Sequence, residues 1–424
     1  MASMILAVLS AAQFLLALDF SIVYVALPGI AADLGLPLTT AQWVVSAYAV
    51  PFAGFLLLGG RLADRLGAGR IFLAALLLFG LACLAGGLAS SGAVLLAARA
   101  VQGFAAALLQ PAVLGLIGAR FPAGAARARA LSVWGAVGAS GLAAGVVLGG
   151  VLTRYSWRWT FLVNVPVTVA CAAGAAIWLL STARVAPAPV PVMRSLLSTA
   201  AAVGVALGLT LGGARGWAIA VAAGAVLFAT VRPQSEQPRT LRIGTVAAAL
   251  YMASVGSEFY VVTLMLQDRD GYPPLRAALA FLPLAALVTV GSSVTDRLIR
   301  RFGAARTLGG GFAAAALGLA GLALAPAGWG YAGGVLPGLL VSGAAHGVIY
   351  TSMFVLGARD VPADRQSAAG ATMTTAQYLA GAVAIAVLTL PLHGGAYATA
   401  FWLTAAAAVA GALIALRRPA PGRL

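Results

Sequence analysis

The decapeptide RLADRLGAGR (residues 61–70) has a near-copy 236 residues further along the chain, RLIRRFGAAR (297–306). Six of the ten positions are identical, and both copies lie between long apolar stretches. Glycine readily adopts the backbone conformations that a tight turn needs, so each copy is expected to form a short turn between two helices. The repeat therefore predicts two halves of related architecture, each with the same arginine-rich hinge.

The sequence around the hinges has the composition of a membrane protein. Of its 424 residues, 62% are hydrophobic and 8% are charged, whereas soluble domains carry about 25% charged residues. Apolar stretches of about 20 residues recur from end to end, and each is long enough to cross a hydrocarbon core of about 30 Å as a helix. The alternating pattern of a membrane β-barrel is absent from the sequence. The chain is therefore predicted to be an all-α polytopic membrane protein.

The apolar stretches predict fourteen membrane spans joined by short loops. Their approximate bounds are 4–27, 42–60, 71–89, 93–118, 131–152, 161–181, 195–213, 217–231, 243–266, 277–294, 307–325, 330–356, 369–391 and 396–416. The first stretch is too long for a signal-peptide core and follows no basic segment, so we expect it to be retained as a span. An even number of spans places both termini on one side of the membrane.

The arginines predict which side that is. All 26 basic residues are arginines, and the net charge is +16. If the N-terminus is cytoplasmic, twenty arginines fall in cytoplasmic loops or the C-terminal tail, five in outer loops, and Arg99 within a span. Because basic residues concentrate on the cytoplasmic side, we expect both termini in the cytoplasm and the chain in the plasma membrane. These arginines form no aromatic-basic run, so nucleic acid is not an expected partner.

The repeat divides the spans into six, two and six. We expect an N-terminal six-helix bundle over 1–182, a two-helix insert with its flanking linkers over 183–242, and a C-terminal six-helix bundle over 243–424. The insert lies between two proline-rich stretches, ARVAPAPVPVMR and RPQSEQPRT, which are linkers or ordinary loops. Parallel repeats of this kind are typical of transporters whose two halves rock around a central site.

Several motifs resemble signatures of the major facilitator superfamily and, within it, of the fourteen-span drug:proton antiporter group. The motifs are LDFSIVYVALP (18–28), GRLADRLGAGR (60–70), RAVQGFAAALLQP (99–111), SWRWTFLVNVP (156–166) and LQDRDGYPPLRAALAFLP (266–283). The resemblance covers essentially the whole chain and implies a major facilitator fold with 14 transmembrane helices. It also implies a proton-coupled secondary transporter that exports small amphipathic compounds, whether drugs, antibiotics or secondary metabolites. The expected partners are a small-molecule substrate, protons and the lipid bilayer, and we expect a monomer.

The first hinge carries one acidic residue, Asp64, among its arginines. The resemblance implies that Asp64 docks on a helix N-terminus of the opposite half, where the positive end of the helix dipole favours a carboxylate. The span that begins near Ser367 is the expected acceptor, and the contact would latch the cytoplasmic side shut. In the second copy Arg300 replaces Asp64, so the latch would not be duplicated. Alternatively, both hinges are only topology signals. The other residues of the expected latch are Gly60, Arg65 and Gly67.

Three ionisable residues, Asp19, Arg99 and Glu258, lie inside spans, where such residues usually line a cavity or a proton path. Each lies six to eight residues from the predicted outer end of its span. At about 1.5 Å per residue they share a depth of about 9–12 Å. The hinge offset of 236 residues maps Asp19 onto Val255, one helical turn from Glu258. We therefore expect the two carboxylates to face a common centre.

The expected role of these residues follows from their burial. A carboxylate buried away from water favours its neutral form and can hold a proton, and once ionised it attracts a cation. The resemblance assigns proton or substrate coupling to Asp19, and proton relay to Arg99 with Gln102 and Gly103 beside it. Glu258 is expected to take part in proton coupling on its depth alone. Its alternative is a structural hydrogen bond to a neighbouring span.

Glycines and aromatic residues complete the candidate site. The run GAVGASGLAAGVVLGG (135–150) resembles the antiporter signature, and its small residues let helices approach closely, for packing or for gating. The residues of this run singled out are Gly145, Gly149 and Gly150. Aromatic side chains that either line an amphipathic pocket or simply pack are Tyr24, Trp43, Tyr48, Tyr251 and Phe259. His346 either titrates near neutral pH as part of that pocket or makes a structural hydrogen bond.

Other function classes lack the residues that they need. The chain has two histidines in no metal-binding pattern and two cysteines, Cys83 and Cys171, both inside apolar stretches. A phosphate-binding loop requires a lysine, and the chain has none. We therefore expect no enzyme activity, no catalytic residues, no metal and no cofactor, and an ion gradient as the energy source. The same carboxylates also suit symport, so a proton-coupled uptake symporter of a small solute is the alternative function. A membrane sensor would need a soluble signalling domain, and no loop is long enough to form one.

Overall fold

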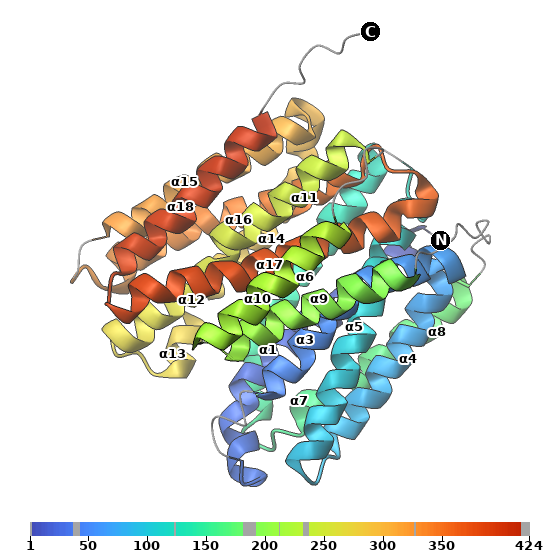
Figure 1. Cartoon of the computed structure of the whole chain (residues 1–424), viewed down its shortest axis with the longest axis horizontal. Helices are drawn as coiled ribbons and strands as arrows, with labels where there is room; N and C mark the ends of the chain where they lie inside the picture. Colours follow the sequence, from blue (N-terminus) through green and yellow to red (C-terminus); the bar gives the residue numbers. More distant parts are fainter. Residues whose placement is uncertain are drawn as a thin grey trace. The chain divides into compact units, whose positions relative to one another are not determined.

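The computed structural model describes residues 2–36, 43–122, 124–180, 192–211, 213–231, 237–325 and 328–416. Within these ranges all regular structure is helical (Figure 1), as predicted, because a helix satisfies its own backbone hydrogen bonds where lipid offers none. Most of the two predicted linkers, and the C-terminal tail with its three arginines, lie outside the described residues.

Two compact units divide the chain. One comprises Met1–Glu236 with Val361–Thr375, and the other comprises Gln237–Asp360 with Ala376–Leu424. Helix α17 therefore contributes its first turns to one unit and the remainder to the other. The bundle boundaries proposed after residues 182 and 242 remain a prediction.

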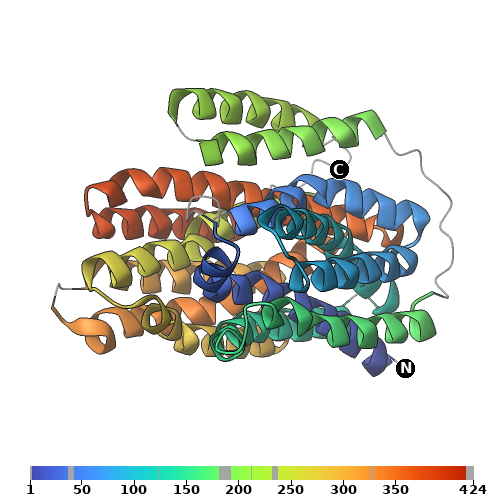
Figure 2. The same ribbon diagram turned by 90° about the horizontal axis from the view of Figure 1, so that it is seen from below.

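The first unit is built from helices that pack in pairs. Helix α1 packs on α6, α3 on α5, and α4 on α5 and α8, while α9 and α10 lie side by side as a hairpin that contacts α3 (Figure 2). Its helices are α1 (Ala2–Asp33), α3 (Trp43–Leu66), α4 (Ala68–Gly87), α5 (Gly92–Arg120), α6 (Ala125–Leu152), α7 (Trp159–Leu162), α8 (Asn164–Trp178), α9 (Val192–Leu211) and α10 (Gly213–Val231), joined by the turn η4 (Ala363–Arg365) and the start of α17 (Gln366–His393).

In the second unit α14 and α15 both pack on α16, α15 also packs on α18, and α11 packs on α16. A short π-helical segment interrupts one of its long helices, and two others lie at the end of that helix and at the start of α16. Its elements are α11 (Arg239–Tyr251), η1 (Met252–Gly256), α12 (Ser257–Leu264), η2 (Met265–Arg269), α13 (Pro274–Leu279), α14 (Leu282–Phe302), α15 (Ala304–Leu324), η3 (Tyr331–Val335), α16 (Leu336–Ala358), the remainder of α17, and α18 (Tyr397–Leu416).

The helices are long and apolar enough for a membrane. Eleven helices in the described part of the chain meet the length and hydropathy of a membrane span. Large apolar side chains are exposed along α4 at Leu77, Leu81 and Leu84 and just after it at Leu88, one turn apart. A soluble protein rarely exposes such a continuous apolar stripe, whereas lipid covers it without cost.

The two hinges have the same turn. Helix α3 ends at Leu66 and α4 begins at Ala68, so Gly67 alone connects them, with φ of 95°. Gly303 connects α14 to α15 in the same way, with φ of 83°. Side chains with a Cβ rarely adopt such positive φ angles, and in the described part of the chain every residue with positive φ is a glycine. The repeated motif therefore encodes a one-residue turn that reverses the chain between two long helices.

Candidate functional site

Asp19 lies at the centre of a buried polar cluster in the first unit. Its Oδ2 accepts a hydrogen bond from Arg99 Nη1 at 2.8 Å. Its Oδ1 accepts from Gln102 Nε2 at 3.3 Å and from Asn164 Nδ2 at 3.1 Å. The four side chains come from α1, α5 and α8, and each is at most 1% exposed. Three side-chain donors converge on one carboxylate, and this arrangement stabilises the negative charge of Asp19.

Arg99 is held on all sides. Its Nε donates to the carbonyl oxygen of Val44 at 3.0 Å, and its Nη1 also donates to Gln102 Oε1 at 3.0 Å. Its guanidinium lies over the ring of Tyr48, 4.4 Å from the ring centroid, and 5.9 Å from that of Phe161. Tyr48, which the sequence suggests as a pocket residue, is 3% exposed and forms the aromatic platform beneath Arg99.

Two members of this cluster were not anticipated from the sequence. Asn164 begins α8 within the motif SWRWTFLVNVP, and its own Oδ1 has no hydrogen-bond partner in the described part of the chain. Cys83 on α4 accepts a hydrogen bond from Gln102 Nε2 at 2.9 Å. A polar residue that interrupts an apolar stretch is a signal that would have identified Asn164, whereas nothing in the local sequence distinguishes Cys83.

The glycines of the candidate site lie where two helices touch. A Cβ added at Gly103 would collide with the carbonyl oxygen of Tyr48, so this glycine lets α5 approach α3 beside Arg99. On α6, Gly145 faces Ser21 and Leu18 of α1, and Gly149 faces Ile22 and Val25. The hydroxyl of Thr153 donates to the carbonyl oxygens of Gly149 and Gly150, at 2.6 and 3.5 Å. These positions hold α1, which carries Asp19, against α6.

Glu258 is buried in the second unit with different partners. Its Oε1 is 2.6 Å from the hydroxyl oxygen of Ser342 on α16, and its Oε2 has no hydrogen-bond partner in the described part of the chain. One turn beyond Ser342, His346 Nε2 is hydrogen-bonded to the hydroxyl of Tyr251. Phe259 lies edge-on to the His346 ring at 6.0 Å and stacks on Phe281 at 5.0 Å.

The helix that carries Glu258 is irregular. The eight-residue helix α12 lies between the π-helical segments η1 and η2, and Glu258 is its second residue. Such π-helical segments are rare and often lie at functional sites. Asp19 and Glu258 belong to different units, and their facing a common centre stays a prediction.

In the first hinge, Asp64 Oδ1 and Oδ2 accept from the backbone N–H groups of Ser367 at 3.1 Å and Ala368 at 2.9 Å. These are among the first N–H groups of α17, which have no partner within the helix. Gly60, one turn before Asp64, brings α3 so close to α17 that an added Cβ would lie 2.5 Å from that of Ala371. The expected contact of Asp64 with this helix N-terminus is therefore present, and its role as a latch stays a prediction.

The remaining residues of the two hinges differ from Asp64 in their surroundings. Arg65 is exposed in the last turn of α3, and Gly67 forms the turn. In the second hinge Arg300 is paired with Asp296 of its own helix. The second copy thus keeps the turn and not the docking carboxylate.

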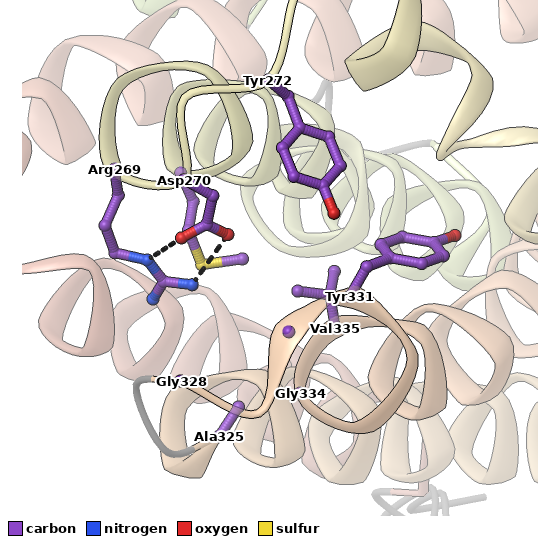
Figure 3. A pocket seen from close by; sticks show the side chains of 10 residues that line it. Arg269, Asp270, Tyr272, Ala325, Gly328, Tyr331, Gly334 and Val335 are labelled. Atoms are coloured by element: carbon purple, nitrogen blue, oxygen red, sulfur yellow. Dashed lines mark hydrogen bonds and ion pairs between the residues drawn. The ribbon is translucent and has the colours of Figure 1, made fainter.

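A pocket of about 280 Å³ lies in the second unit, at the end of η2 (Figure 3). Tyr272 and Tyr331 line it together with Arg269 and Asp270, which form an ion pair at 2.7 Å. The aromatic residues suggested from the sequence are not among those that line it. The two that are exposed are Tyr24, at 48%, and Trp43, at 38%. A role of the suggested aromatic residues in substrate binding stays a prediction.

Comparison with known proteins adds the family. The profile of the Major Facilitator Superfamily matches residues 9–385. The chain is 37% identical over 412 residues to the cephamycin export protein CmcT of Amycolatopsis lactamdurans, across 89% of this chain and 82% of that protein. It is 35% identical over 408 residues to the puromycin resistance protein pur8 of Streptomyces alboniger, across 90% and 80% of the two chains.

The fold is also that of solved transporters. The crystal structure of the human organic anion transporter MFSD10 superposes with a TM-score of 0.78 at 16% identity and covers 98% of this chain and 99% of that one. At this identity the likeness concerns the fold alone. The sequence matches and the fold agree, and the chain belongs to the Major Facilitator Superfamily of membrane transporters.

Proposed function

We propose that the chain is a proton-coupled exporter of small amphipathic compounds such as antibiotics, other drugs or secondary metabolites. Its membership of a transporter family is established, and the names of relatives such as the cephamycin export and puromycin resistance proteins support drug export. The observation that carries the proposal is the Asp19–Arg99 pair, at 0% and 1% exposure inside a helical bundle of a membrane protein. Ionisable side chains at such positions are costly in lipid and usually serve a transport or proton pathway.

The proposed mechanism uses the exchange of partners at Asp19. In the resting state Arg99, Gln102 and Asn164 satisfy the carboxylate. A cationic group of the substrate, or a proton, competes with Arg99 for the Asp19 oxygens. The proton neutralises the carboxylate and the cationic group pairs with it, so either weakens the attraction between Asp19 and Arg99. Substrate and proton then bind in alternation, which is the requirement for antiport.

Alternating access requires that contacts on one side of the membrane form and break. Asp64 is suited to this role, because it caps the start of α17 from another helix through two hydrogen bonds. The protein would then have one state with this contact and one without it. A ligand that binds the second state more tightly raises the population of that state, to an extent set by the difference between its two affinities. We propose that Asp64, with Gly60, Arg65 and Gly67, forms a latch that is closed in one state and open in the other.

We also propose fourteen spans, with both termini in the cytoplasm and the protein as a monomer in the plasma membrane. In support, three helices come in addition to the eleven of span-like length and hydropathy. They are α6, α9 and α10, with 28, 20 and 19 residues. Helices of about 20 residues just cross a bilayer core of about 30 Å. A reporter that is active only outside the cytoplasm, fused after Leu211, should be active if α9 and α10 form a membrane hairpin.

The test of export compares antibiotic susceptibility in a bacterial host that lacks its main efflux pumps. We expect expression of the chain to raise the inhibitory concentration of puromycin, a cephamycin or ethidium several-fold, and an uncoupler of the proton gradient to abolish the difference. The control is Asp19→Asn at matched expression. If no compound changes in inhibitory concentration, or if uncoupling leaves the resistance intact, the proposal is wrong.

A further inference from the structure

Two carboxylates that are 0% exposed, Asp19 and Glu258, differ in how their charge is compensated. Asp19 has a guanidinium at 2.8 Å and two amide donors. Glu258 is 0% exposed, yet the hydroxyl of Ser342 is its single hydrogen-bond partner in the described part of the chain. An ionised carboxylate without a cation and with one oxygen unpartnered is very unfavourable away from water, whereas a neutral carboxylic acid is tolerated.

The other charged and titratable groups on the elements that pack against α12 do not change this balance. On η2, Arg269 pairs with Asp270 at 2.7 Å, and Asp268 is exposed. On α18, Tyr397 lies near Arg269, 5.9 Å from its guanidinium. Tyr251 and His346, from α11 and α16, are hydrogen-bonded to each other. No cation therefore faces Glu258 among the described residues of these elements.

The contacts of Ser342 fit a protonated Glu258. The Ser342 oxygen is 2.6 Å from Glu258 Oε1 and 3.3 Å from the carbonyl oxygen of Leu339. A hydroxyl has one proton to donate and can also accept. If Glu258 is neutral, its O–H donates to the Ser342 oxygen and the Ser342 O–H donates to Leu339. If Glu258 is ionised, the Ser342 hydroxyl must turn to the carboxylate and abandon Leu339.

We propose that Glu258 holds one proton at rest, with Ser342 as the positioning residue, while Asp19 is ionised and paired with Arg99. The proposal rests on the proposed function and adds a second proton site to Asp19, where substrate and proton compete. The proton leaves Glu258 Oε1 for water when the site opens, and the Ser342 hydroxyl then reverses from acceptor to donor. Uptake of a proton restores the first arrangement.

Infrared spectroscopy of the purified full-length protein in lipid tests the assignment without any substrate. A protonated carboxylic acid gives a C=O stretching band that a carboxylate lacks. We expect this band at neutral pH in the wild type and in Asp19→Asn, and its loss in Glu258→Gln. A band that is absent from the wild type, or that disappears in Asp19→Asn and persists in Glu258→Gln, overturns the proposal.

Three further variants test the positioning role of Ser342 and cover the case in which Glu258→Gln does not fold. Ser342→Ala should keep the band and shift it to higher frequency, because the acid loses its hydrogen bond, and Ser342→Thr should restore the wild-type frequency. Glu258→Asp retains a carboxylic acid and should retain a band if Glu258→Gln does not fold. An unshifted band in a folded Ser342→Ala protein refutes the role of Ser342. Because these measurements need no transport, a failure of the export proposal leaves the infrared result interpretable.

Discussion

Asp19 has a cation beside it, whereas Glu258 has none among the described residues of the neighbouring helices, although both carboxylates are fully buried. Bringing either charge out of water costs several kcal/mol, and the pairing of Asp19 with Arg99 offsets much of this cost for both partners. At the scale of single residues, Asp19 forms an ion pair and accepts from two amide donors. Glu258 has a hydroxyl partner, Ser342, and we propose that it is the neutral acid.

The ion pair makes a prediction about stability. Asp19→Asn should lower the stability of the protein by about 3–5 kcal/mol, because it leaves the Arg99 charge buried without a partner. Thermal unfolding in detergent measures the loss. The double variant Asp19→Asn/Arg99→Gln should regain much of the stability and remain inactive in transport. An Asp19→Asn protein as stable as the wild type would contradict the description of this pair.

The sequence predicts part of this residue-scale chemistry. Helix depth alone predicts that Asp19 and Arg99 lie at the same level, and they are in contact. The same reasoning does not find Ser342, because small polar residues in spans are common and their partners depend on how helices rotate about their axes. Tyr48 shows the same difficulty, since its position under Arg99 follows from three-dimensional packing.

At the scale of elements, the hinge explains why the chain repeats an arginine-rich decapeptide. Its glycine makes the one-residue turn in both copies, with φ of 95° at Gly67 and 83° at Gly303. Its acid is present in the first copy alone: Asp64 caps the start of α17, whereas its counterpart Arg300 pairs with Asp296, the residue just before the second copy. The turn is thus a structural feature that both copies share. The Asp64 carboxylate, which the first copy alone has, is the group that we propose controls access.

The latch makes a prediction about the population of open states. Asp64→Asn removes the charge and one of the two acceptor oxygens that bind the first N–H groups of α17. Such an interaction contributes about 0.3–2 kcal/mol, so the open population should rise by a factor of about 2 to 30. The matched control is Asp296→Asn, at the residue just before the second hinge that pairs with Arg300, and it should leave the population unchanged.

Labelling of a buried cysteine measures this population. Ala371 is 0% exposed and faces Gly60 behind the Asp64 contact. In a background with Cys83 and Cys171 replaced by serine, Ala371→Cys should react with a membrane-impermeant thiol reagent faster when Asp64→Asn is added. Equal rates with and without Asp64→Asn would show that the contact does not control access.

Element boundaries were predictable where a capping residue and a turn bound the apolar stretch, and less so at the hinges, where α3 and α14 continue to Leu66 and Phe302. The span predicted at 93–118 is helix α5, Gly92–Arg120, because both ends are set by a capping serine and a proline-containing loop. The first span, predicted at 4–27, extends as α1 to Asp33, since a helix continues beyond the hydrocarbon core. The π-helical segments on either side of Glu258 leave no pattern in the apolar residues, so hydropathy does not reveal them.

At the scale of the whole molecule, hydropathy predicts a helical membrane protein and the resemblance of the motifs implies the superfamily fold, which the family match and the structural likeness confirm. The direction of transport does not follow from the sequence, because it depends on which compartment gives the proton and which gives the substrate. Antiport and symport use the same buried carboxylates, so flux measurements distinguish them.

Ethidium flux into proteoliposomes tests proton-coupled export by this protein. The purified protein is reconstituted with ethidium outside and a pH gradient imposed across the membrane; ethidium suits this assay because its charge does not change with pH. If the protein is a proton antiporter, ethidium should accumulate in protein-containing vesicles whose lumen is acidic. This accumulation should fall strongly when the pH is equal on both sides. Protein-free vesicles and Glu258→Gln serve as controls. Accumulation at the same rate without a gradient, or faster accumulation with an alkaline lumen, would contradict antiport.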